Sequence, residues 1–110
     1  MSRVDRVAEK IKADVSEIIR KSVDDPRIGF ITITKVSVSP DLETARIFVS
    51  VLGTDAQKQD TMKGLLSAQK LIRLKLGDKL RLRNVPEISF VLDESIEKAS
   101  RVWNLMKKLK

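Results

Sequence analysis

Apolar residues recur every three or four positions from residue 3 to residue 19, the spacing that lines one face of an α-helix. This face comprises Val4, Val7, Ala8, Ile11, Val15, Ile18 and Ile19. We expect the helix to end at Asp24-Asp25-Pro26, because proline forces the residue before it out of the helical region. Gly29 then keeps the following loop open.

Two segments with the two-residue period of β-strands follow this helix. The β-branched run from 30 to 39 predicts a strand, but its alternation slips phase between Ile33 and Val36. A β-bulge near Thr34 and Lys35 would repair the phase. From 43 to 52 the apolar residues Ala45, Ile47, Val49 and Val51 alternate strictly with Thr44, Arg46, Phe48 and Ser50, and the stretch between the two segments has the composition of a turn. The two strands therefore predict an antiparallel hairpin.

The segment 57–77 has a helical period with a conflict inside it. One face of an unbroken helix would carry Met62, Leu65, Leu66, Gln69, Ile72 and Leu76. Leu71 and Leu74 would then lie on the far side, so either an apolar patch is exposed or the helix changes direction. We expect the second arrangement, with a helix break at Ser67, Ala68, Gln69 and Lys70 and an end near Gly77.

A third strand and a last helix complete the pattern. Pro86 is tolerated at the start of a strand in which Ile88, Phe90 and Leu92 alternate with polar or smaller residues. Ser95 can cap a helix that ends in lysines near its negative dipole end. The expected core positions of this helix are Ile96, Ala99, Val102, Trp103, Met106 and Leu109. The order α-β-β-α-α-β-α predicts one α+β domain over 1–110, a three-stranded sheet with helices packed on one face.

The 110-residue chain contains no cysteine and no histidine. This composition excludes disulfides, thiolate nucleophiles, Cys/His zinc sites and imidazole bases. The carboxylate pairs Asp24-Asp25 and Asp93-Glu94 are typical of caps and solvated loops, and no glycine-rich phosphate loop is present. The sequence therefore favours a binding protein over an enzyme and predicts no cofactor, metal or small-molecule substrate. No apolar run reaches the roughly 18 residues that span a bilayer, so we expect a cytoplasmic protein without membrane contact.

The net charge of +7 is concentrated in one part of the chain. Segment 58–83 has eight basic and two acidic residues and so carries +6 of it. Its basic residues are Lys58, Lys63, Lys70, Arg73, Lys75, Lys79, Arg81 and Arg83. Such a patch points to a polyanionic partner, the alternative being a solvated helix face.

A helix break inside a basic stretch would present free backbone N–H groups to a phosphate, with Lys70 and Arg73 beside it. Leu71 and Leu74 would then form the apolar floor of a groove for bases, although core packing is the commoner role of leucine. Phe48 lies off the apolar side of its strand and is the one candidate stacking platform, but we favour its being covered by a helix. Phe90 and Trp103 fit core faces.

Several stretches of this sequence resemble, in their order, the bacterial ribosome-binding factor A family. The central one is Asp25-Pro26-Arg27-Ile28-Gly29-Phe30 with the following Ile31-Thr32-Ile33-Thr34 and Val36-Ser37-Val38-Ser39-Pro40-Asp41-Leu42. The others are 3–11, 76–83, 86–90 and 93–97. The resemblance implies a type II KH-like domain that binds the small (30S) ribosomal subunit and its 16S rRNA during maturation, with a role in cold adaptation. Family members commonly carry an Ala-x-Gly kink, and the matching stretch here is Ala68-Gln69-Lys70.

The leading hypothesis is thus a non-catalytic, monomeric factor that contacts rRNA phosphates. The expected first-rank contacts are Lys63, Lys70, Arg73, Lys75, Lys79, Arg81 and Arg83, and the second-rank contacts are Arg3, Arg6, Arg27 and Arg46. One alternative is a KH-like nucleic-acid-binding module without a ribosomal target. Another is a protein-interaction domain whose basic patch meets an acidic partner.

Overall fold

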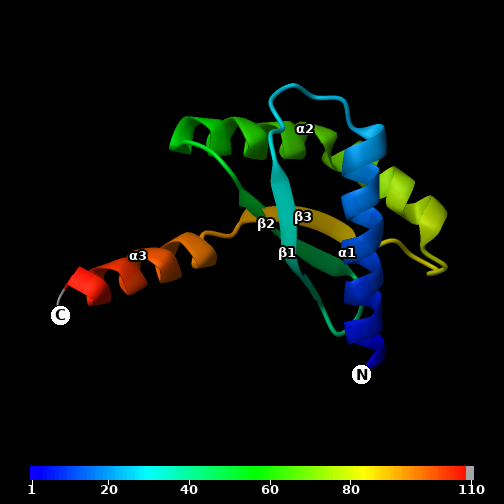
Figure 1. Cartoon of the computed structure of the whole chain (residues 1–110). Coiled ribbons are helices and arrows are strands. Elements are labelled where there is room, and N and C mark those ends of the chain that lie inside the picture. The colour runs from blue at the N-terminus through cyan, green and yellow to red at the C-terminus, as the bar shows by residue number, and fades with distance from the viewer. Residues whose placement is uncertain (109–110) are drawn as a thin grey trace.

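The computed structural model describes residues 1–108 and has three helices and three strands (Figure 1). Their order is α1 (Arg3–Ser22), β1 (Ile31–Val38), β2 (Thr44–Val51), α2 (Asp55–Lys79), β3 (Glu87–Leu92) and α3 (Ser95–Lys108). The α+β class predicted from the periodicity is confirmed. Helix α1 starts with a capping box, in which the Ser2 hydroxyl accepts from the Asp5 N–H and the Asp5 carboxylate accepts from the Ser2 N–H.

The sheet has the order β1-β2-β3, with β1 antiparallel and β3 parallel to the central strand β2. The hairpin prediction is confirmed, and so is the bulge, because the register shifts between Ile33 and Lys35. The extra residue is Thr34, whose hydroxyl donates to the Asp93 carboxylate at 2.6 Å. The bulge restores the phase, so that Ile33 and Val36 both point into the core.

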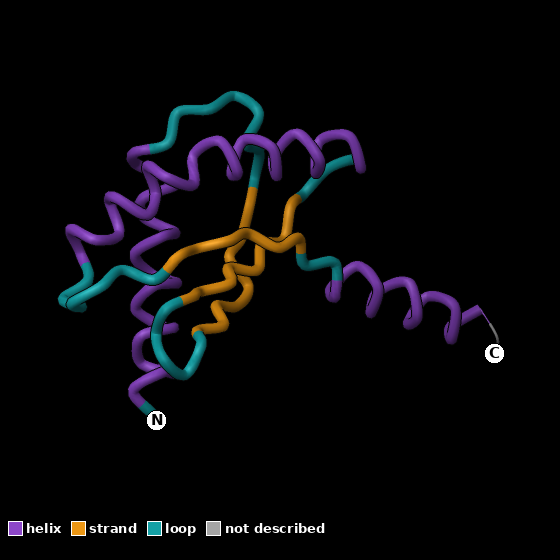
Figure 2. Tube along the Cα trace, turned by 180° about the vertical axis from the view of Figure 1, so that it is seen from behind, coloured by secondary structure: helices purple, strands orange, loops and turns teal. Residues whose placement is uncertain are grey.

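One hydrophobic core joins α1, α2 and a single face of the sheet. Ile11, Val15 and Ile18 of α1 are buried in it, as the helical spacing predicts. The alternating residues of β2 from Ala45 to Val51 enter it from the sheet. In the described part of the chain no helix covers the opposite face of the sheet (Figure 2).

Helix α2 is bent but not broken. Its axis changes direction part-way along (Figures 1 and 2), yet residues 67–70 are all helical and α2 is assigned as one helix from Asp55 to Lys79. The two predicted middle helices are therefore two arms of one helix, which we call the first arm (55–66) and the second arm (71–79). The predicted change of direction is confirmed, whereas the predicted break at Ser67, Ala68, Gln69 and Lys70 is wrong as an interruption.

The buried face of α2 stays in phase across the bend, through Thr61, Leu65, Ile72 and Leu76. The bend consequently does not turn the remaining leucines inward. Leu66 and Leu74 are each 69% exposed, and Leu71 is also exposed. The expected burial of Leu66 is wrong, and the apolar patch that the predicted break was meant to avoid is present.

The backbone conformation of Lys70 can be tested by substitution. Among the described residues only Leu42 and Gly53 have a positive φ, so Lys70 is an ordinary helical residue. Lys70→Gly should then destabilise the protein by about 1 kcal/mol, because glycine loses more backbone entropy in a helix. Urea denaturation measures the change. A more stable glycine variant would contradict the regular helical conformation at this position.

Helix α3 leaves the body of the molecule and packs on neither the sheet nor the other helices along its length (Figure 1). None of its described residues is buried. The expected core role of Ile96, Ala99, Val102, Trp103 and Met106 is therefore wrong, while Leu109 lies outside the described residues. The amphipathic period is present, but nothing within residues 1–108 covers its apolar side. The prediction of helices on one face holds for α1 and α2 only.

The start of α3 is fixed by Asp93. Its carboxylate accepts from the Ser95 backbone N–H at 2.9 Å and from the Thr34 hydroxyl at 2.6 Å. Hydrogen bonds from Ser95 and then Thr34 lower the pKa of Asp93 to about 2. A lowered pKa means that this carboxylate stabilises the fold above its ordinary pKa of 3.8 and that the contribution disappears as the pH falls through about 2.

We expect the Asp93 carboxyl carbon to titrate near pH 2 in an NMR pH series, since its hydrogen-bond donors favour the charged form. Thr34→Val keeps the branched shape and removes one donor, so it should raise the midpoint toward the ordinary value. An unchanged midpoint in this variant would show that Thr34 does not hold the carboxylate.

Candidate nucleic-acid interface

The segment between α2 and β3 presents arginines on one side and apolar residues on the other. Leu80 is buried and Leu82 half-buried, whereas Arg81 and Arg83 are exposed. This alternation continues the two-residue period of an extended chain. The segment is thereby attached to the core by its leucines, and both guanidinium groups face solvent.

The second arm of α2 holds this segment in place. Arg73 donates to the carbonyl oxygens of Val85 at 2.9 Å and Pro86 at 3.1 Å. Gln69 lies at the bend, one turn before Arg73, and donates to the carbonyl of Ile88 in β3 at 2.6 Å. A Cβ on Gly77 would lie 3.0 Å from the Val85 side chain, so a small residue allows the close approach. Arg73 therefore has a structural role besides its positive charge.

A hollow of about 450 Å³ separates this segment from the N-terminal half of α1. Its charged lining residues are all basic: Arg3, Arg6, Lys10, Lys79 and Arg81. Lys79 lies 3.3 Å from Glu17 and Lys10 lies 3.1 Å from Asp14. The arginines of this hollow make no salt bridge with any of residues 1–108. Their charge is available to an anion from solution.

Two further hollows continue the basic surface around the segment. One hollow, of about 650 Å³, lies against the second arm and is lined by Lys70, Arg73, Leu74 and Arg83. Asp78 is the acidic residue in its lining. The other hollow has a volume of about 660 Å³. Arg73 and Arg83 line both of these hollows, and Arg3 lines both the 660 Å³ hollow and the hollow beside α1. That third hollow also contains Asp41, Glu43 and Glu87. The three hollows adjoin.

We call this surface the basic end. It comprises Arg3, Arg6, Lys10, Lys70, Arg73, Lys79, Arg81 and Arg83. Five of the seven first-rank residues predicted from the sequence meet here, together with two of the second-rank ones. Lys10 was missed by the sequence analysis, although it follows Arg3 and Arg6 at the three-and-four spacing of one helical face.

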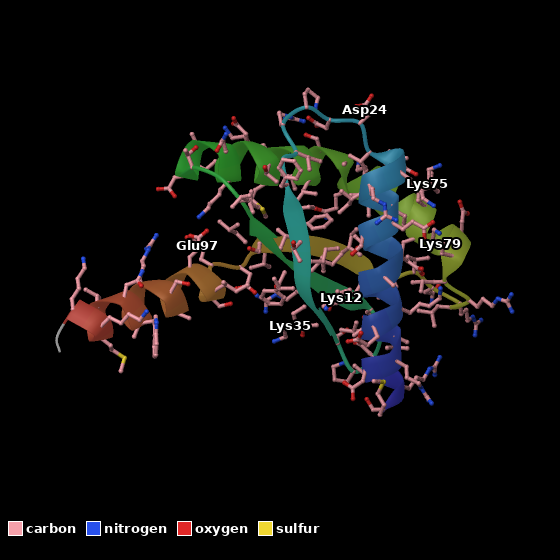
Figure 3. All side chains as sticks on the ribbon, viewed as in Figure 1. Lys12, Asp24, Lys35, Lys75, Lys79 and Glu97 are labelled. Atoms are coloured by element: carbon pink, nitrogen blue, oxygen red, sulfur yellow. The ribbon has the colours of Figure 1, made fainter. Side chains whose placement is uncertain are left out.

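The other predicted contacts lie elsewhere. Lys63 is exposed on the first arm, and Lys75 is exposed on the second arm on the same side as Lys79, without lining these hollows (Figure 3). Arg27 lies in the loop before β1, in a bidentate pair with Asp25. Hydrogen bonds from Arg27 lower the pKa of Asp25 to about 2. Arg27 thus has an acidic partner already.

Arg46 lies on the uncovered face of the sheet. Its guanidinium carbon and the Lys35 ammonium each lie 5.2 Å from the centre of the Phe48 ring. The expected helical cover over Phe48 is therefore wrong, since the ring is flanked by two cations. Arg46 is not part of the basic end.

The helix break was also expected to supply backbone N–H groups for a phosphate. Because residues 67–70 are helical, these N–H groups belong to the helix interior and are not free. Leu74 lines the hollow with Lys70 and Arg73, and both Leu71 and Leu74 are exposed, so the core-packing alternative is wrong for these leucines. An anion at the second arm would therefore meet side chains alone.

No cluster of metal-ligating side chains occurs among the residues that the structure describes. No helix within them is long and apolar enough to cross a bilayer. Within residues 1–108, charge and shape thus single out the basic end as the candidate site.

Comparison with known proteins yields one consistent family. The family model of ribosome-binding factor A matches residues 3–106. The crystal structure of ribosome-binding factor A from Thermus thermophilus superposes with a TM-score of 0.73 at 20% identity, over 83% of this chain and 97% of that one. A solution structure of a Thermotoga maritima protein, described as a ribosome-binding factor A, superposes with a TM-score of 0.74 at 32% identity, over 84% and 89% of the two chains.

A third similar structure is a homology model of the Thermus thermophilus factor fitted into a cryo-electron microscopy map of its complex with the 30S subunit. It has a TM-score of 0.67 and 21% identity and covers 79% of this chain and 91% of its own. The first two structures each cover more than four fifths of this chain, and the family model covers almost the whole sequence. The chain belongs to the ribosome-binding factor A family.

Proposed function

We propose that this protein is a non-catalytic assembly factor that binds the small (30S) ribosomal subunit through its 16S rRNA during maturation. The observation that carries the proposal is the continuous basic end, formed by α1, Lys70 at the bend of α2, the second arm and the segment 80–86. Membership of the family and the 30S complex of the Thermus relative support the ribosomal target. The proposal includes a single monomeric KH-like domain over 1–110, without a cofactor, and a role in growth in the cold.

The chemistry of the basic end favours contacts to phosphate over reading of bases. Its lining includes arginine and lysine side chains and aliphatic residues but no aromatic residue. Guanidinium groups bind phosphate oxygens in a bidentate manner and neutralise backbone charge, whereas base recognition in single strands uses stacking on aromatic rings. The factor would therefore recognise a folded arrangement of rRNA phosphates and hold it during maturation.

Co-sedimentation with purified subunits tests the proposal. The protein should sediment with small subunits and not with large ones, and the bound fraction should fall as salt rises, because phosphate contacts release counterions. Equal binding to small subunits and to unrelated free RNA would favour a general KH-like module. Binding to acidic proteins in place of either would favour a protein-interaction domain.

A further inference from the structure

Helix α3 presents an apolar side to solvent. Five large apolar residues of this helix are 56% to 62% exposed, namely Ile96, Val102, Trp103, Leu105 and Met106. Their spacing places them within one half of the helix circumference, which also contains Lys98, while Glu97, Arg101 and Lys108 lie on the other half. An exposed apolar face of this kind marks an interaction site in a soluble protein.

The apolar surface continues onto the body of the molecule. Ile96 lines a hollow of about 450 Å³ together with Phe30 and Leu52, which are 82% and 78% exposed. The Leu52 N–H donates to the Phe30 carbonyl at 3.1 Å, so the two residues are held next to each other. The patch thus begins at one end of the sheet and extends along α3, away from the second arm and the N-terminus (Figures 1 and 2).

The base of α3 is fixed rather than loosely tethered. Lys58 of the first arm is only 5% exposed, and its ammonium lies 2.6 Å from the Glu97 carboxylate and 4.0 Å from Glu94. A nearly buried ammonium needs such a partner, since an unpaired charge held away from water would destabilise the fold. Asp93 holds the preceding turn. These contacts orient the apolar side of α3 outward.

The charges on α3 indicate what can cover it. The helix carries four basic residues, namely Lys98, Arg101, Lys107 and Lys108. Its acidic residue, Glu97, forms a salt bridge with Lys58. Two copies of this helix would bring like charges together. For RNA bases the described part of this helix offers one aromatic ring, Trp103, whose centre lies 5.4 Å from the Lys107 ammonium. The other apolar groups of the face are aliphatic or thioether groups, which do not stack on bases. The composition fits a protein groove with an apolar floor and an acidic rim.

We propose that α3, with Phe30 and Leu52, docks in an acidic-rimmed apolar groove of a protein component of the small subunit. This inference rests on the proposed function: the basic end contacts rRNA at one end of the molecule while α3 contacts protein at the other. The longest dimension of the molecule is 56 Å, and the two chemically different surfaces lie toward its opposite ends (Figure 1). Binding at both ends would fix the orientation of the factor on the particle.

The test compares 30S subunits with protein-free 16S rRNA as ligands of the full chain. Trp103→Gln/Met106→Gln removes apolar area without changing charge, and Leu66→Gln on the first arm is the matched control. The double variant should lose about tenfold or more in affinity for 30S subunits, the effect of removing interface anchors. Its affinity for protein-free rRNA and its melting temperature should not change, and the control should bind both ligands normally.

Each other outcome overturns the inference in a recognisable way. Equal losses on 30S subunits and on protein-free rRNA would make α3 an RNA contact. A concentration-dependent dimer of the wild type, abolished in the double variant, would make a second copy the occupant. A large drop in melting temperature would mean that α3 packs on its own chain. Normal binding of 30S subunits by the variant would refute the docking site alone, whereas failure of the wild type to bind them would refute the proposed function as well.

Discussion

Replacing Ile11 with proline is expected to unfold the whole protein, because the change removes a helical hydrogen bond and a buried side chain at once. Ile11 lies in the middle of α1 and is fully buried against the sheet. A proline inside a helix costs about 3 kcal/mol or more. Loss of a buried isoleucine side chain adds about 2 to 5 kcal/mol. Together they approach the total stability of a small domain, about 5 to 15 kcal/mol.

Circular dichroism and thermal melting measure this effect. Ile11→Ala is the matched control, because it leaves the cavity but keeps the helix, and it should lower the melting temperature while the protein still folds. A proline variant that melts close to the wild type would mean that α1 contributes little to the core. The comparison separates the backbone effect from the packing effect at one position.

Reversing the charge of Arg81 and Arg83 should produce the largest loss of RNA affinity among surface variants. Both side chains are exposed and face the hollows of the basic end. Charge-assisted hydrogen bonds contribute about 1.5 to 3 kcal/mol each, so Arg81→Glu/Arg83→Glu should weaken binding of protein-free 16S rRNA by about 100-fold or more. Loss of two phosphate contacts should also reduce the slope of log affinity against log salt by about 1.5.

The control for this variant is Lys107→Glu/Lys108→Glu, which makes the same change in net charge at the far end of α3. On protein-free rRNA it should have a much smaller effect, since α3 is not part of the basic end. Similar losses from both pairs would show that total charge governs the binding and that the position of the cations does not. The melting temperature of each variant should stay near the wild-type value, because none of these side chains is buried.

The elements that depend on local periodicity could be predicted from the sequence. The buried face of α1, the hairpin and the bulge at Thr34 each follow from the spacing of apolar residues within one segment. The position of α3 could not be predicted in this way. Its period shows that one side is apolar, but whether that side meets the chain's own core depends on contacts far away in the sequence.

The basic end likewise has a part that could be predicted from the sequence and a part that depends on tertiary packing. The charge of 58–83 identified the second arm and the arginines that follow it. Arg3 and Arg6 join them only because α1 packs beside the segment 80–86, and Lys10 comes with that helix face. The positions of Leu71 and Leu74 predict a break in α2 only if exposed leucines are avoided. They are tolerated on the surface of a bent but continuous helix.

The parallel pairing of β2 and β3 has a consequence for the order in which the chain folds. The hairpin of β1 and β2 joins neighbouring segments, so it can form early. Thr44 and its partner Glu87, in contrast, are 43 residues apart, and closing such a loop is slow until the intervening helix has formed. We expect β3 to be the last strand to join the sheet. The segment 80–86 ends where β3 begins, so the RNA-binding surface would be completed only in the final step of folding.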